Sequence, residues 1–165
     1  MAQDTQIICP QIDTCEEISP SLIKHILVPF DLSDMSHRAF EFSLDLAKKY
    51  NARISVLTIM YSEVLSSSFL DMSSHQKIIE KEKMSQISTS FILLEDAAKK
   101  FSVQLKSDMV FSKNVADTIL SFSTNRKVDL IVMGTRARSS PRRFMIGSVA
   151  MDVIQKASCP VILVK

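Results

Sequence analysis

The sequence predicts an α/β fold, with a doubly wound, five-stranded parallel sheet and helices on both faces. Short apolar runs alternate with stretches of helical periodicity, and the connections between them have the length that crossovers between parallel strands require. The chain has 165 residues, of which 46% are hydrophobic, so it can bury one sizeable core. We expect residues 1–23 to form a mobile extension, because they lack a sustained period, and residues 24–165 to form one domain.

The predicted strands are short, and most of them are apolar. The first, HILVPF at residues 25–30, is closed by Pro29, which cannot donate a hydrogen bond to a sheet. The other four are expected at residues 53–60, 103–111, 128–133 and 160–164. The runs at residues 25–30 and 128–133 suit buried strands, the first of them buried on both faces, whereas residues 103–111 alternate in part.

The first helix is predicted from its end signals. Ser33 is expected to cap its N-terminus, Asp34 adds negative charge to the first turn, and Asn51 follows the lysines of the last turn. A long helix follows the serine-rich connection that ends near Ser73. Its apolar residues recur at steps of three and four and predict one buried stripe: Met84, Ile87, Phe91, Leu94, Ala98 and Phe101. Two shorter helices are expected at residues 114–125 and 147–158.

Composition argues against several classes of function. The net charge of +2, with mostly interleaved charges, gives no argument for nucleic-acid or membrane binding. No apolar run approaches the roughly 18 residues that a membrane span needs, and the first residues carry acids where a signal peptide carries bases. The 3 cysteines and the 3 histidines lack metal-type spacing. We therefore expect a cytoplasmic protein with reduced thiols.

Both glycines of the chain lie in one stretch, DLIVMGTRARSSPRRFMIGSV at residues 129–149. Gly134 follows a predicted strand, and Gly147 with Ser148 would open a helix, whose free N–H groups suit an anion. Four arginines between the glycines add positive charge: Arg136, Arg138, Arg142 and Arg143. The stretch is either an anion-binding scaffold at the carboxyl edge of the sheet or a solvated basic loop. It contains no Gly-Lys-Ser/Thr, and no G-x-G-x-x-G follows the first strand, which argues against a P-loop NTPase and an ordinary dinucleotide dehydrogenase.

Two blocks of the chain resemble the universal stress protein family. They are HILVPFDLSDMSHRAFEFSLDLA near the start and DLIVMGTRARSSPRRFMIGSVAMDVIQKASCPVILVK at the end, and the resemblance covers about residues 24–165. Nucleotide-binding members carry a glycine, two residues, a second glycine, nine residues and then Gly-Ser or Gly-Thr. Gly134 and the pair Gly147-Ser148 match this motif, but Ala137 stands at the second glycine. If residue 137 needs a positive φ, the alanine costs on the order of 1 kcal/mol.

The resemblance implies a site for ATP or another adenine nucleotide, with or without Mg²⁺. Pro29, Phe30 and Asp31 would line it from the first loop, with Ile59 and Met133 near the adenine. The residues implied around the ribose and phosphates are Gly134, Ala137, Arg138, Gly147, Ser148 and Val149. Asp31 would contact the nucleotide or hold the magnesium ion, and its alternative role is to cap the helix that follows.

The resemblance also implies a homodimer formed through the last strand, PVILVK, which would otherwise leave a sheet edge open. A stress-response or signalling module that binds nucleotide and acts on a protein partner of unknown identity is then the expected function. Two alternatives stay open: a dimeric interaction protein that binds no nucleotide, and a slow magnesium-dependent ATPase. Dedicated catalysis is the weaker hypothesis, because no residue is an evident base for water.

Overall fold

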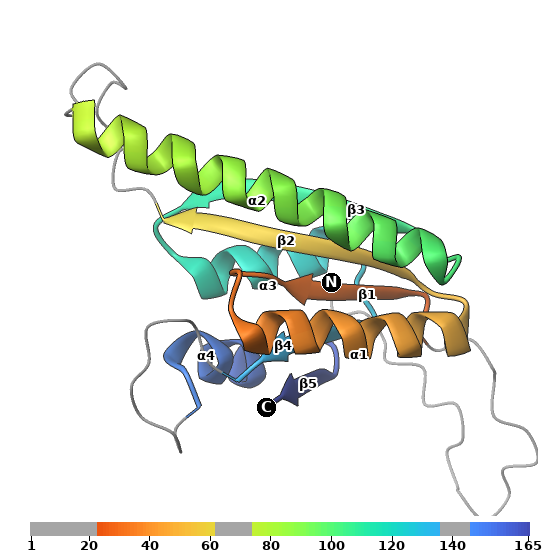
Figure 1. Cartoon of the computed structure of the whole chain (residues 1–165). Helices are drawn as coiled ribbons and strands as arrows, with labels where there is room; N and C mark the ends of the chain where they lie inside the picture. The colour runs from red at the N-terminus through yellow and green to blue at the C-terminus, as the bar shows by residue number, and fades with distance from the viewer. Residues whose placement is uncertain (1–22, 62–73, 136–145) are drawn as a thin grey trace, which may run out of the picture.

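The structure is a computed structural model that describes residues 23–61, 74–135 and 146–165 (Figure 1). Nearly all of the expected N-terminal extension lies outside the described residues, as do the serine-rich connection and the four arginines between the glycines. Ile23, the last residue of that extension, packs against the core.

Five parallel strands form one sheet in the order β3-β2-β1-β4-β5, so the predicted fold class is confirmed. The strands are β1 (His25–Pro29), β2 (Arg53–Tyr61), β3 (Leu105–Ser112), β4 (Leu130–Gly134) and β5 (Val161–Val164). The helices between them are α1 (Asp34–Tyr50), α2 (Ser74–Lys100), α3 (Val115–Asn125) and α4 (Ser148–Lys156). The chain builds outward from β1 to β3 on one side and then returns to build β4 and β5 on the other. The strand order therefore reverses beside β1.

Helices cover both faces of this sheet, with α1 and α2 on one face and α3 and α4 on the other (Figure 1). Alternate side chains of β1 pack on opposite faces of the sheet. Ile26 and Val28 pack against α1 and α2, whereas Leu27 packs against α3 and α4. All three are fully buried. This explains why the β1 run is apolar throughout and does not alternate with polar residues.

The predicted end signals of α1 are confirmed. Ser33 has an extended backbone, and its Oγ accepts a hydrogen bond from the Ser36 N–H at 3.1 Å. Asn51 ends the helix in the left-handed region, at φ 53°, and its N–H is bonded to the Ala47 carbonyl. The two caps fix where α1 begins and ends relative to β1 and β2.

The buried stripe predicted for α2 is only partly correct. Ile87, Leu94 and Ala98 are buried, but Met84 is 37% exposed and Phe101, just beyond the helix, is 46% exposed. The predicted positions recur slightly faster than an α-helix turns, so the first and the last lie about 100° apart around its axis. One straight helix cannot turn both toward the sheet.

Candidate functional site

A cavity of about 520 Å³ opens at the carboxyl ends of β1, β2 and β4. It lies where the strand order reverses, which is the usual ligand position in doubly wound sheets. Its lining residues are Pro29, Phe30, Asp31, Ser33, Ser36, Leu57, Ile59, Val115, Ile119, Met133, Gly134, Thr135, Gly147, Ser148, Val149 and Ala150.

Most residues that the sequence nominates for a site meet in this cavity. They come from the loop after β1, the ends of β2 and β4, and the start of α4: Pro29, Phe30, Asp31, Ile59, Met133, Gly134, Gly147, Ser148 and Val149. Ala137 and Arg138 lie outside the described residues, as do Arg136, Arg142 and Arg143. The arginines therefore give no argument for or against an anion-binding scaffold. The described residues that line the cavity supply the only structural argument.

One wall of the cavity is apolar. Leu57, Ile119 and Met133 are almost completely buried, and Ile59 and Val115 pack against the same cluster beneath α3 and α4. An apolar wall of this kind suits the face of a flat heteroaromatic ring. Sequence reasoning found Ile59 and Met133 but missed Leu57, Val115 and Ile119, because the helix that carries two of them belongs to a distant segment.

The N-terminus of α4 also lines the cavity. Ser148, Val149 and Ala150 line the cavity and are the first three residues of the helix, whose N–H groups have no partner within it. Gly147 precedes them as the N-cap and offers no side chain, and its own N–H donates to the Thr135 carbonyl at 2.8 Å. The positive end of a nine-residue helix therefore opens into the cavity.

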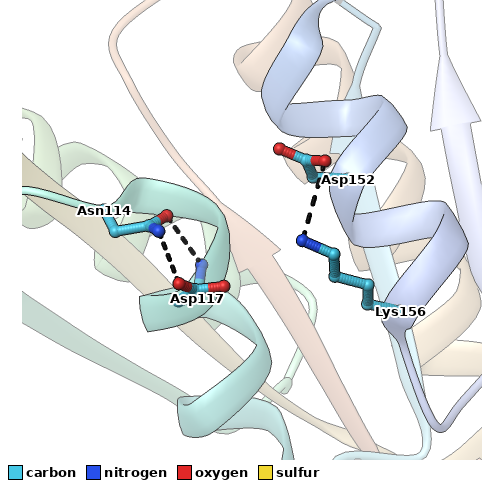
Figure 2. Close-up of polar contacts among 4 residues, drawn as sticks. All are labelled: Asn114, Asp117, Asp152 and Lys156. Atoms are coloured by element: carbon cyan, nitrogen blue, oxygen red, sulfur yellow. Dashed lines mark hydrogen bonds and ion pairs between the residues drawn. The ribbon is translucent and has the colours of Figure 1, made fainter.

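The two other helices that begin at this cavity have N-termini that are capped by side chains. Ser33 caps α1. At α3, the Asn114 Oδ1 accepts from the Asp117 N–H at 3.2 Å, and its Nδ2 donates to the Asp117 carboxylate (Figure 2). The same figure shows that α4 carries its ion pair, Asp152 with Lys156, beyond its first turn. Of these three helices, α4 is thus the one whose start remains available to an anion.

Asp31 supports the start of α1 through the residue before the helix. Its Oδ1 accepts a hydrogen bond from the Ser33 N–H at 3.0 Å, and Ser33 then caps the helix. The intervening Leu32 has a positive φ of 65°, so the turn is tight. Ser33 and not Asp31 is therefore the cap of α1. Asp31 supports that cap, and its exposed carboxylate lines the cavity.

Gly134 is required by packing. A Cβ atom at this position would lie 2.7 Å from the Met35 Cβ and 3.0 Å from the Met35 carbonyl carbon. The absence of a side chain thus lets the first turn of α1 approach the end of β4. Gly147 differs, because its φ of −64° is open to any residue.

Thr135 is a polar residue that sequence reasoning missed. It follows β4 directly, its N–H donates to the Val164 carbonyl, and the residue is only 4% exposed. Within the described part of the chain, its buried Oγ1 has no hydrogen-bond partner. A buried hydroxyl without a partner is costly, and Thr135 also lines the cavity, so its hydroxyl is a candidate ligand contact. The signal in the sequence was its place immediately after Gly134 at a strand end.

Within the described ranges, no three His, Cys, Asp or Glu side chains form a group that could hold a metal ion. Among the described residues that line the cavity, Asp31 is the one carboxylate that could bind a metal ion. Mg²⁺ is commonly held by one or two carboxylates together with substrate phosphates. No described helix has the length and apolar character needed to cross a membrane.

Comparison with known proteins agrees with the fold. The model of the family described as "Universal stress protein family" matches residues 22–165. The Universal stress protein MJ0531 of Methanocaldococcus jannaschii is 29% identical over 145 residues, which cover 88% of this chain and 84% of that protein.

Two solved structures with similar folds are universal stress proteins with bound nucleotides. One, in complex with cAMP, has a TM-score of 0.67 and 22% identity, and the match covers 88% of this chain and 99% of that one. The other, from Archaeoglobus fulgidus in complex with dAMP, has a TM-score of 0.58 and 22% identity and covers 87% and 98%. Since the family match spans nearly the whole described chain, this protein belongs to the universal stress protein family.

Proposed function

We propose that this protein is an adenine-nucleotide-binding module of stress response or signalling. The observation that carries the proposal is the pairing, in one cavity, of an apolar wall with the uncapped N-terminus of α4. A base fits against Ile59 and Met133, and phosphates fit at the N–H groups of Ser148 and Val149. The relatives with bound cAMP and dAMP support this choice of ligand.

Three further residues would complete the site. The Thr135 hydroxyl would gain its missing partner from the ribose or a phosphate. The Asp31 carboxylate would contact the nucleotide or hold a Mg²⁺ ion bound to its phosphates. Arg138 would add positive charge near them. Asp31 is the only carboxylate among the described lining residues and already accepts a hydrogen bond, so hydrolysis has little support.

Calorimetry with ATP, AMP and cAMP, each with and without Mg²⁺, tests the proposal. Gly147→Val places a branched side chain at the start of α4, where the backbone tolerates any residue, and should abolish measurable binding. Met151→Val is the matched control, because Met151 lies in the same helix, is 40% exposed and does not line the cavity. Equal affinities of the two variants would refute binding at the start of α4. No binding of any nucleotide at millimolar concentration would refute nucleotide binding and leave an interaction protein as the alternative.

We also propose that two copies pair through β5. This strand lies at the edge of the sheet and is half-buried along its length. The N–H groups of Ile131 in β4 and of Thr135, just after it, donate to the carbonyls of Pro160 and Val164. The backbone groups of Val161 therefore face the open side. Val161→Pro should therefore remove an outward donor, keep the β4 ladder and yield monomers in light scattering, whereas Val161→Ile should stay dimeric. A monomeric parent protein would overturn the dimer.

A further inference from the structure

A second cavity, here named the basic cavity, lies at the opposite edge of the sheet. It has a volume of about 480 Å³ and lies where α1 and α2 end, against the start of β2. Lys48, Arg53 and Lys100 line it, and no acidic residue is among its described lining residues. The proposed nucleotide function makes no use of it.

The basic cavity has an exposed aromatic side chain at its rim. Phe101 is 46% exposed, and the Lys48 ammonium lies 5.6 Å from the centre of its ring. Phe101 also lines an apolar groove between α1 and α2, whose other side chains include the acidic pair Glu41 and Asp45. A partner for the basic cavity should thus combine acidic residues with some apolar ones, and its acids should avoid the groove.

The N-terminal extension enters the described part of the chain beside this cavity. Ile23 packs against the core on the α1 and α2 side of the sheet. The carbonyl of the next residue, Lys24, accepts a hydrogen bond from the N–H of Arg53 at 2.9 Å. Residue 22 is therefore two residues before Lys24, whose carbonyl is hydrogen-bonded to Arg53, a lining residue of the basic cavity.

The composition of residues 1–22 matches the cavity. They contain four acids, Asp4, Asp13, Glu16 and Glu17, and neither lysine nor arginine, together with several isoleucines. Glu17 is six residues before Ile23, and six residues of extended chain span at most about 21 Å. The acids are thus within reach of Lys48 and Lys100.

We propose that the acidic extension, residues 1–22, docks into the basic cavity of its own chain. Its carboxylates neutralise Lys48, Arg53 and Lys100, and its isoleucines cover Phe101. Docking restricts an extension whose composition alone predicts free movement. The inference is independent of nucleotide binding, because the two cavities lie at opposite edges of the sheet.

Paramagnetic relaxation enhancement tests this with the chain's own cysteines. Cys15→Ser and Cys159→Ser leave Cys9 in the extension as the single thiol for a nitroxide label. In the full-length protein, the amide signals of Asn51, Arg53 and Ser102 should be broadened, whereas that of Gly134 at the opposite edge should keep its intensity. Absence of this broadening would refute docking.

Two lysine variants test the charge argument. Lys48→Gln with Lys100→Gln removes two cations of the cavity and should abolish the broadening. Lys49→Gln with Lys99→Gln removes the same charge from the same helix turns but not from the cavity, and should leave it unchanged. Raising the salt from about 0.01 M to about 1 M shortens the Debye length from roughly 30 Å to roughly 3 Å, so broadening should fall. Persistence in the first variant would contradict the proposal.

Two more samples distinguish other occupants. Spin-labelled protein without isotope is mixed with isotope-labelled protein without spin label, and broadening in that mixture would show docking on a second copy, against the proposal. Inorganic pyrophosphate is added to the parent protein as a probe for small anions. If pyrophosphate shifts the signals of Asn51 and Ser102 while the nitroxide leaves them sharp, the cavity is a small-anion site and the extension is not its occupant.

Discussion

The two edges of the sheet obtain positive potential in different ways. At the carboxyl edge, Asp31 is the only ionisable side chain among the described residues that line the cavity, and the backbone of α4 supplies the attraction for an anion. At the amino edge, Lys48, Arg53 and Lys100 supply it. In a parallel α/β sheet the helices begin at one edge and end at the other, so their dipoles favour anions at the first edge only. Lysines must therefore offset the negative helix ends before the second edge can attract an acidic segment.

The largest expected effect separates the two glycines of the carboxyl edge. Gly134→Ala should lower the free energy of unfolding by about 1–3 kcal/mol, because its Cβ would meet Met35 at 2.7 Å. Gly147→Ala should cost less than about 1 kcal/mol, because only the N-cap preference changes. Urea denaturation measures both. Similar losses in the two variants would contradict the packing role of Gly134.

The next effect concerns a histidine at the amino edge. His25 is 3% exposed, its Nε2 lies 2.8 Å from the Ser55 Oγ, and its Nδ1 lies 3.1 Å from the Arg126 carbonyl oxygen. Burial, and then the nearby charge of Arg53, lower the pKa of His25 below 6.5. The imidazole of His25 therefore binds a proton more readily in the unfolded chain than in the folded one. Above pH 6.5 it is neutral in both states and does not change the free energy of unfolding with pH. As the pH falls from 6.5 toward the lower folded-state pKa, protonation of the unfolded chain lowers the free energy of unfolding.

One pKa unit corresponds to about 1.4 kcal/mol, so the decline should be measurable in urea titrations between pH 7 and pH 5, values chosen to bracket roughly the reference pKa. His25→Gln should flatten this part of the pH dependence. The matched control is His37→Gln, which changes an exposed histidine of α1 and should keep the decline. A decline of equal steepness in both variants would show that another group causes it.

These comparisons also show what the sequence could predict. The five strands, the order of the helices and the caps of α1 follow from local patterns, because each depends on residues within a few positions of one another. The need for glycine at position 134 could not be predicted, since the clash involves Met35, about a hundred residues earlier. The spacing of Met84 and Phe101 already shows that one helix cannot turn both toward the sheet, but which predicted residues are exposed depends on the part of the sheet that α2 covers. For the site, position after a strand predicted Asp31 and Gly134, whereas the unpartnered state of the Thr135 hydroxyl required the packing around it.

A smaller effect distinguishes Thr135 from a similar threonine elsewhere. Thr135→Val and Thr58→Val each remove a buried hydroxyl without a partner among the described residues, so neither should lower the free energy of unfolding substantially. Thr135 lines the cavity at the carboxyl edge and Thr58 does not. The first variant should therefore weaken nucleotide binding in calorimetry by roughly threefold to tenfold, the equivalent of about 0.5–1.5 kcal/mol, and the second should not. Equal affinities would remove Thr135 from the site.

The smallest expected effect is at Ala137, which replaces the second glycine of the family motif and lies outside the described residues. In the described part of the chain, four residues adopt a positive φ, and all are non-glycine: Leu32, Asn51, Ser102 and Lys127. This chain thus already places ordinary side chains in left-handed backbone, at a cost of about 1 kcal/mol each. If nucleotide binding requires a positive φ at residue 137, the alanine there would cost a similar amount. Ala137→Gly should therefore raise ATP affinity by no more than about fivefold, as measured by calorimetry against the parent protein. Equal or weaker binding would mean that the nucleotide-bound backbone at residue 137 suits alanine as well as glycine, and that the departure from the motif costs the site nothing.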